Sequence, residues 1–75
     1  MLTEQLSHIR ELLEQRDWVR IRESMDGVPA PELAELLFEI DTPDRMILFR
    51  LLPRDISSEV FSLLESEQQN TLLKE

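Results

Sequence analysis

The residues whose type and spacing could support specific chemistry are carboxylates in the middle of the chain. Three glutamates at spacings of three and four residues share one face of a predicted helix, and two aspartates follow at the start of the next: Glu32, Glu35, Glu39, Asp41 and Asp44. Carboxylate oxygens are the ligands that Mg²⁺ and Ca²⁺ prefer in proteins. The sequence has no EF-hand loop, however. An acidic helix face in contact with water is therefore the favoured interpretation, and a cation site is the alternative.

Catalysis finds little support among the other polar residues. The one histidine, His8, stands between Ser7 and Ile9 with no nucleophile or orienting acid marked beside it, and a surface position is expected for it. Cysteine is absent, which excludes a disulfide, a thiolate zinc site and a cysteine nucleophile. There is also no glycine-rich phosphate loop and no histidine-pair metal motif. The sequence thus predicts a protein that is not an enzyme.

The aromatic residues are expected to belong to the core rather than to a ligand cage. They are Trp18, Phe38, Phe49 and Phe61.

The charge balance restricts the kinds of partner. Sixteen acidic against eight basic residues give a net charge of −8, which disfavours binding to nucleic acid or anionic lipid and favours cations or basic partners. Residues 1–10 show no secretion signal, and the longest apolar run is Met46-Ile47-Leu48-Phe49, whereas a membrane span needs roughly 20 residues. We expect a soluble chain, with a cytoplasmic setting, that does not itself insert into a membrane.

The elements that position these residues are predicted to be six short helices. In the first helix the apolar residues Leu2, Leu6, Ile9 and Leu13 step by four, three and four residues, which is helical spacing. Asp17 is expected to cap the second helix, which carries apolar residues at positions 18, 21 and 25 and ends at Asp26-Gly27.

Prolines organise the next two helices. Pro31 is placed as the first residue of the third helix, and Thr42-Pro43 repeats the arrangement, with Thr42 as the cap and Pro43 as the first residue of the fourth. Pro53 ends the fourth helix, because the residue before a proline is disfavoured in a helix. The inner faces are predicted from Leu33, Leu36, Leu37 and Ile40 in the third helix and from Met46, Ile47, Phe49, Leu51 and Leu52 in the fourth.

The last two helices follow the same logic. Asp55 lies early in the fifth helix, where its charge suits the positive end of the helix dipole. The sequence 66–69, Ser-Glu-Gln-Gln, is interpreted as a capping box that opens the sixth helix, and that helix is expected to be still running at Glu75. The predicted apolar stripes are Ile56, Val60, Leu63 and Leu64 in the fifth helix, and Leu72 and Leu73 in the sixth.

Several helices end in two adjacent leucines, and this feature indicates a stack of helix pairs that are too small to bury their own faces alone. The pairs are Leu12-Leu13, Leu36-Leu37, Leu51-Leu52, Leu63-Leu64 and Leu72-Leu73. We expect an all-α fold, and at least one of Leu51 and Leu52 should lie at the centre of the stack.

The leucine pairs belong to a longer pattern that resembles the cytosolic N-terminal domain of the MgtE family of magnesium channels. The resemblance covers roughly residues 28–73, and its most specific part is the run 48–53, Leu-Phe-Arg-Leu-Leu-Pro, followed by Glu59-Val60. The remaining matching residues are Leu36, Leu37, Arg45, Ser58, Leu63, Leu64, Gln69, Leu72 and Leu73.

The resemblance implies a fold, a role and one site residue. The fold is a right-handed superhelix of short antiparallel helices, similar to armadillo-like stacks, and residues 1–75 would be one helical domain forming the first part of a larger N-terminal regulatory domain. In the family, CBS domains and a dimeric membrane channel follow, and magnesium held between the N and CBS domains closes the channel. The glutamate that the family contributes to this magnesium site maps to Glu59.

Some features depart from the family pattern. Glu32 stands where the family often has Asp, and the later acidic helix, the CBS domains and the channel are not in the sequence. The expected function is that of a magnesium-sensing, gating module of an MgtE-type transporter. The alternative is a stand-alone helical-repeat adaptor for protein interactions, and the stack also resembles the middle domain of a flagellar motor switch protein.

Overall fold

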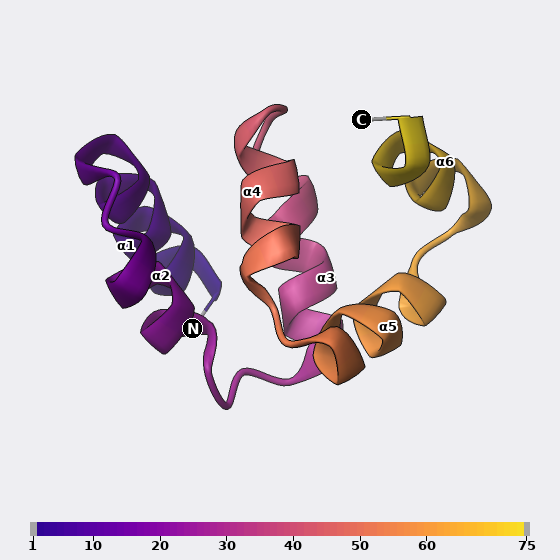
Figure 1. The fold of residues 1–75 in the computed structure, drawn as a ribbon, viewed down its shortest axis with the longest axis horizontal. Helices are drawn as coiled ribbons and strands as arrows, with labels where there is room; N and C mark the ends of the chain where they lie inside the picture. Colours follow the sequence, from indigo (N-terminus) through magenta and orange to yellow (C-terminus); the bar gives the residue numbers. More distant parts are fainter. Residues whose placement is uncertain (1, 75) are drawn as a thin grey trace.

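The computed structural model describes residues 2–74, and in this part of the chain every regular element is an α-helix (Figure 1). The helices are α1 (Leu2–Gln15), α2 (Trp18–Met25), α3 (Ala30–Phe38), α4 (Asp44–Leu51), α5 (Arg54–Leu63) and α6 (Ser66–Lys74). The predicted all-α class and the six helices are confirmed. Two details of the prediction, the side chain of Leu2 and the helix still running at Glu75, lie outside what the structure describes.

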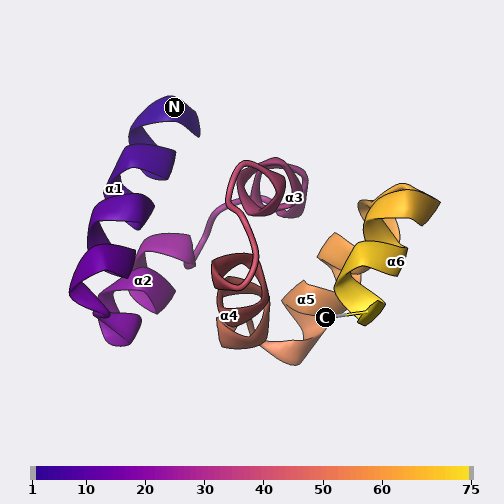
Figure 2. The same cartoon turned by 90° about the horizontal axis from the view of Figure 1, so that it is seen from above.

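The helices follow one another across the molecule from one side to the other. In Figures 1 and 2, α1 and α2 lie together at one side, α3 and α4 in the middle, and α5 and α6 at the other side. The principal contacts are those of α3 with α5, α1 with α2, α2 with α4, α3 with α4, and α1 with α3. Helix α3 therefore lies at the centre, in contact with α1, α4 and α5.

A single core joins the first five helices. Each of them contributes at least one fully buried side chain: Ile9, Ile21, Leu33, Leu37, Leu48 and Val60. The predicted inner face of α3 is confirmed, because Leu33, Leu36, Leu37 and Ile40 are all buried. Helix α6 adds Leu72, which is buried but lies outside the main core cluster.

The predicted apolar stripes of the later helices needed correction. Leu48, which is not among the residues of the predicted inner face of α4, is fully buried, whereas Leu63 and Leu73, which are predicted to face inward, are 51% and 74% exposed. Adjacent residues on a helix point about 100° apart, so only one leucine of a pair faces a one-sided core. Leu36 and Leu37 are both buried because α3 has neighbours on several sides.

Several helix ends lie where the sequence predicts them. The Asp17 side chain accepts a hydrogen bond of 3.2 Å from the Arg20 backbone N–H and caps α2. Helix α2 ends at Met25, and Gly27 has a φ of +79°, in the left-handed region that glycine adopts without strain. Pro53 follows the end of α4, and Asp55 lies in the first turn of α5, both as predicted.

The other predicted helix starts are shifted by one residue. Helix α3 begins at Ala30, one residue before Pro31, and α4 begins at Asp44, so that Pro43 is the cap residue and not the first helical one. Proline fits both positions, because neither requires its missing N–H. Boundaries of this kind are the least predictable part of a helix.

The predicted capping box of α6, with Ser66 as the cap residue, is not formed. The first helical residue is Ser66, and the Gln68 side chain accepts a hydrogen bond of 3.1 Å from the Glu65 backbone N–H. Glu65, and not the predicted Ser66, therefore precedes the first helical residue, and among the described residues only the Gln68 half of a capping box is present. The side chain of Gln69 donates a hydrogen bond of 2.8 Å to the Phe61 carbonyl and ties α6 to α5.

Candidate functional site

Glu59 is placed on the surface by its neighbour in α5. Val60 is fully buried against the core, and Glu59 points about one third of a turn away from it, so its carboxylate is exposed. Within residues 2–74 no cation forms an ion pair with this carboxylate. Glu59 is thus available to a ligand or to a second domain.

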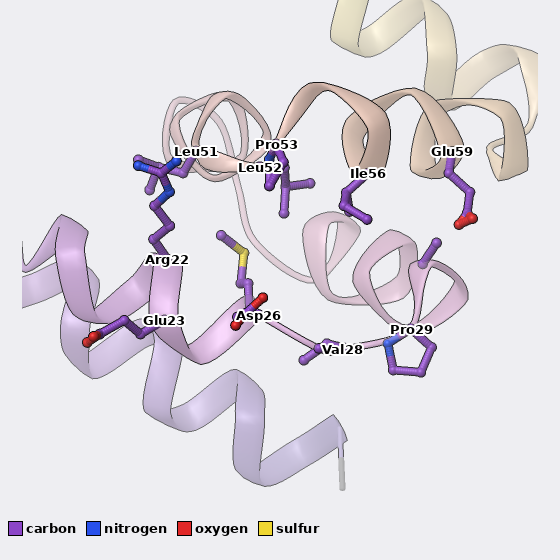
Figure 3. Close-up of a pocket in the computed structure, with 13 residues that line it drawn as sticks. Arg22, Glu23, Asp26, Val28, Pro29, Leu51, Leu52, Pro53, Ile56 and Glu59 are labelled. Atoms are coloured by element: carbon purple, nitrogen blue, oxygen red, sulfur yellow. The ribbon is translucent and has the colours of Figure 1, made fainter.

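An open hollow lies beside Glu59, and we call it the α2–α5 groove. It has a volume of about 560 Å³ and runs between the end of α2 with the following loop and the corner that joins α4 to α5 (Figure 3). Its lining is Arg22, Glu23, Met25, Asp26, Gly27, Val28, Pro29, Ala30, Leu51, Leu52, Pro53, Ile56 and Glu59. In Figure 3, Glu59 stands at one end of the groove and Arg22 and Glu23 at the other.

The carboxylates singled out in the sequence do not gather into a metal site. Glu32, Glu35, Glu39 and Asp41 are exposed and Asp44 is half-buried. Among residues 2–74 there is no group of three or more acidic or histidine side chains that could surround an ion. This part of the chain therefore presents these residues as an acidic surface.

A second hollow of about 360 Å³ includes two of these aspartates. Asp41 and Asp44 line it together with Arg10, Arg16 and Trp18. The Arg10 guanidinium donates a hydrogen bond of 2.7 Å to the Glu39 carbonyl, which links α1 to the end of α3. The mixture of cations and carboxylates here indicates a contact between helices rather than an ion site.

The histidine and the aromatic residues lie as the sequence suggested. His8 is exposed on α1. Trp18, Phe38 and Phe49 are half-buried and pack against the core cluster, and Phe61 is also half-buried. No catalytic arrangement is formed by these side chains in the described residues.

Arg45 has a structural role that the residue pattern alone did not indicate. Its Nε atom donates to the carbonyls of Leu37, at 3.1 Å, and Ile40, at 3.0 Å, and its guanidinium lies 4.3 Å from the centre of the Phe38 ring. The Leu37 carbonyl lies in the last turn of α3 and also accepts from the Ile40 backbone N–H, whereas Ile40 lies just after the helix, so Arg45 ties the end of α3 to the turn that follows. An arginine a few residues after a predicted helix end is the signal that could have suggested this contact.

Comparison with known proteins identifies one family. The family model described as MgtE intracellular N domain matches residues 28–75, which include α3 to α6 and the loop before them. The match contains Glu59, Arg45 and most of the α2–α5 groove. No protein of curated function matches the sequence significantly. None of the helices in residues 2–74 is sufficiently long and apolar to cross a membrane.

Proposed function

Because the chain belongs to the family of MgtE intracellular N domains, we propose that it is a magnesium-sensing, gating module of an MgtE-type magnesium transporter. The observation that carries this proposal is the family match, which extends over well over half of the chain. Membership of a transporter family agrees with the prediction that the chain is not an enzyme. The module would work on the cytoplasmic side of the membrane, beside the CBS domains of a dimeric parent transporter.

We place Glu59 at the regulatory magnesium site. Its carboxylate is exposed, and a hard oxygen donor of this kind suits Mg²⁺, which keeps several waters and takes one or two carboxylates from a surface. Since no three suitable donors meet within residues 2–74, an ion held by Glu59 needs further ligands from a facing surface. This donor set fits a shared site at a domain interface and does not fit an ion enclosed by this chain.

The proposed action on gating follows from charge. The chain has a net charge of −8, so an acidic surface facing it is repelled until a cation lies between the two. Magnesium favours the closed arrangement only to the extent that it binds that arrangement more tightly than the open one. Glu59 contributes to this difference if its carboxylate meets the ion only in the closed arrangement.

The arrangement of helices is compatible with the start of a superhelical, armadillo-like stack. Three pairs of helices follow one another across the molecule (Figure 1). In such stacks each unit contacts mainly its neighbours. We propose that residues 1–75 form the first part of a larger regulatory domain whose later helices extend this series.

The test is a magnesium titration of channel current on a transporter that carries this chain. Glu59→Gln removes the charge and keeps the volume, so we expect gating to need more magnesium, by roughly tenfold for a loss of about 1.4 kcal/mol. Glu11→Gln, which makes the same change on α1 outside the family match, is the control and should leave the midpoint unchanged. Equal midpoints for Glu59→Gln and the parent would remove Glu59 from the site.

A further inference from the structure

The α2–α5 groove has an apolar interior. Met25 and Leu52 are buried, and Val28, Leu51 and Ile56 are half-buried along its length. In Figure 3 the side chains of Leu52 and Ile56 point from the α4–α5 corner toward the loop that follows α2. A volume of about 560 Å³ is in the range of roughly 300–1,000 Å³ that is usual for ligand sites.

The rim of the groove is acidic. Three carboxylates, Glu23, Asp26 and Glu59, stand against the single cation Arg22, which leaves a rim charge of −2. Within residues 2–74 none of these three carboxylates is in an ion pair. They are also spread along the rim, with Glu23 and Asp26 on the α2 side and Glu59 on α5 (Figure 3).

The combination of an apolar interior with an acidic rim favours one kind of occupant over the others. A small apolar molecule would fill the interior but gain nothing from the exposed carboxylates, which would stay in water, and these carboxylates do not form a group that could surround one metal ion. A second copy of the chain would bring another net charge of −8 to an acidic rim. An amphipathic helical segment meets both requirements, because it lays apolar side chains into a groove and carries cations along its edges.

We propose that the α2–α5 groove is a docking site for a short amphipathic polypeptide segment whose apolar side chains are flanked by lysine or arginine. The apolar residues seat on Val28, Leu52 and Ile56, and the flanking cations face Asp26 and Glu59. The Glu23 side chain points away from the groove interior in Figure 3 and adds negative charge at its outer end. This interaction goes beyond the magnesium role proposed above. It holds whether or not Glu59 takes part in binding an ion.

The probe is a fluorescein-labelled helical peptide of about four turns, with leucines at helical spacing and lysines beside them. Binding to the 75-residue chain is measured by fluorescence anisotropy at low salt, and the site by amide shifts in ¹⁵N NMR spectra. One comparison peptide replaces every lysine with glutamate, and another replaces every leucine with serine. We expect the lysine–leucine peptide to bind at least about tenfold more tightly than either, with shifts concentrated at Gly27, Val28 and Ile56.

Variants of the chain separate the rim from the overall charge. Glu23→Gln combined with Asp26→Asn removes two rim charges, and we expect it to weaken binding of the lysine–leucine peptide by about fivefold, as for two exposed ion pairs. The matched control is Glu4→Gln combined with Glu11→Gln, which removes two exposed charges from α1 outside the groove. The control should change binding less than twofold, roughly the effect of screened distant charges.

Four results would overturn the proposal. The first is equal binding of the lysine and glutamate peptides, and the second is an equal effect of the rim and control variants. The third is a set of amide shifts that lie elsewhere than the groove. The fourth is self-association of the chain without any peptide, seen as a rise in mass by sedimentation together with amide shifts at the groove. This result would identify a second copy of the chain as the occupant.

Discussion

The side chain of Arg45 shows how a single residue can connect two helices. It is half-buried, and its Nε atom donates to two carbonyls at the end of α3 while its guanidinium lies over the Phe38 ring. A planar guanidinium can make these contacts together, whereas an ammonium group has neither the planar fork nor the same stacking surface. Arg45 therefore stabilises the turn between α3 and α4.

We predict that Arg45→Met lowers the free energy of unfolding by about 1–3 kcal/mol, because it removes the side-chain donor to the Ile40 carbonyl and the contact with the Phe38 ring. Arg45→Lys should recover less than half of this loss. The measurement is urea unfolding followed by circular dichroism at 222 nm. Arg50→Met, at an exposed position on the same helix, is the control and should cost less than about 0.5 kcal/mol. Equal losses in the two variants would contradict the capping role of Arg45.

The position of Glu59, the residue that we propose as a magnesium ligand, could be predicted from sequence only in part. Its exposure follows from its place beside Val60, an apolar residue at helical spacing from Ile56. Its proposed role as a ligand came from the family resemblance, because one carboxylate on a helix has no distinguishing pattern. The α2–α5 groove could not be predicted, since it forms where residues 22–30 approach residues 51–59, which are distant in sequence.

At the scale of the helices, the sequence predicted the number of helices well, because helical spacing and turn residues agree. Asp17, Gly27 and Pro53 each mark an end that the structure confirms. The errors concern which leucine of an adjacent pair faces inward, as at Leu63 and Leu73. That choice depends on which neighbouring helix covers the position, and such contacts are not encoded in local spacing.

Two residues have a positive φ, and we predict that substitutions at them have opposite effects on stability. Gly27, at +79°, has no atom within 4 Å of an added Cβ, so Gly27→Ala should cost about 1 kcal/mol through backbone strain alone. Arg16, at +54°, already carries this strain after α1, so Arg16→Gly should be neutral or stabilising by up to about 0.5 kcal/mol. Thermal unfolding of both variants is the measurement. This account of the two helix ends would be contradicted if Arg16→Gly lowered the melting temperature, or if Gly27→Ala left it unchanged.

Leucine truncations test the core that joins the helices. Leu48→Ala removes a fully buried side chain and should cost about 2–5 kcal/mol. For a small domain with about 5 kcal/mol in total, this loss leaves much of the chain unfolded. Leu52→Ala, at 8% exposure, should also be costly, and Leu73→Ala, at 74%, should cost under about 0.5 kcal/mol. Circular dichroism melts that coincide for Leu48→Ala and Leu73→Ala would refute the core assignment.

For the whole molecule, the features that matter are one shared core and a large negative charge. The core includes residues from α1 to α5, while α6 lies beside α5 with its own buried leucine. The molecule measures 31 × 23 × 22 Å and has a net charge of −8. The Debye length is about 30 Å at 0.01 M salt and about 10 Å at 0.1 M. At low salt, charges across the entire molecule therefore repel one another.

We predict that added NaCl raises the urea midpoint of the chain, because screening reduces this repulsion in the folded state more than in the expanded unfolded state. MgCl₂ at equal ionic strength should add only a gradual further increase. A shared site with one carboxylate on this chain gives a dissociation constant in the millimolar range or weaker, about −4 kcal/mol. Magnesium at a concentration equal to that constant would stabilise the fold by only about 0.4 kcal/mol.

Charge screening and magnesium binding can be distinguished by measuring the urea midpoint in both salts. In each salt, Glu59→Gln is compared with Glu11→Gln. Both variants remove one exposed charge, so in NaCl they should shift the midpoint alike. In MgCl₂ they should differ by no more than about 0.4 kcal/mol at millimolar magnesium, since the proposed site needs further ligands from a facing surface. A saturating rise at micromolar magnesium that Glu59→Gln abolishes would show a complete ion site on these 75 residues. The proposed sharing of magnesium between domains would then be wrong, although the family assignment would stand.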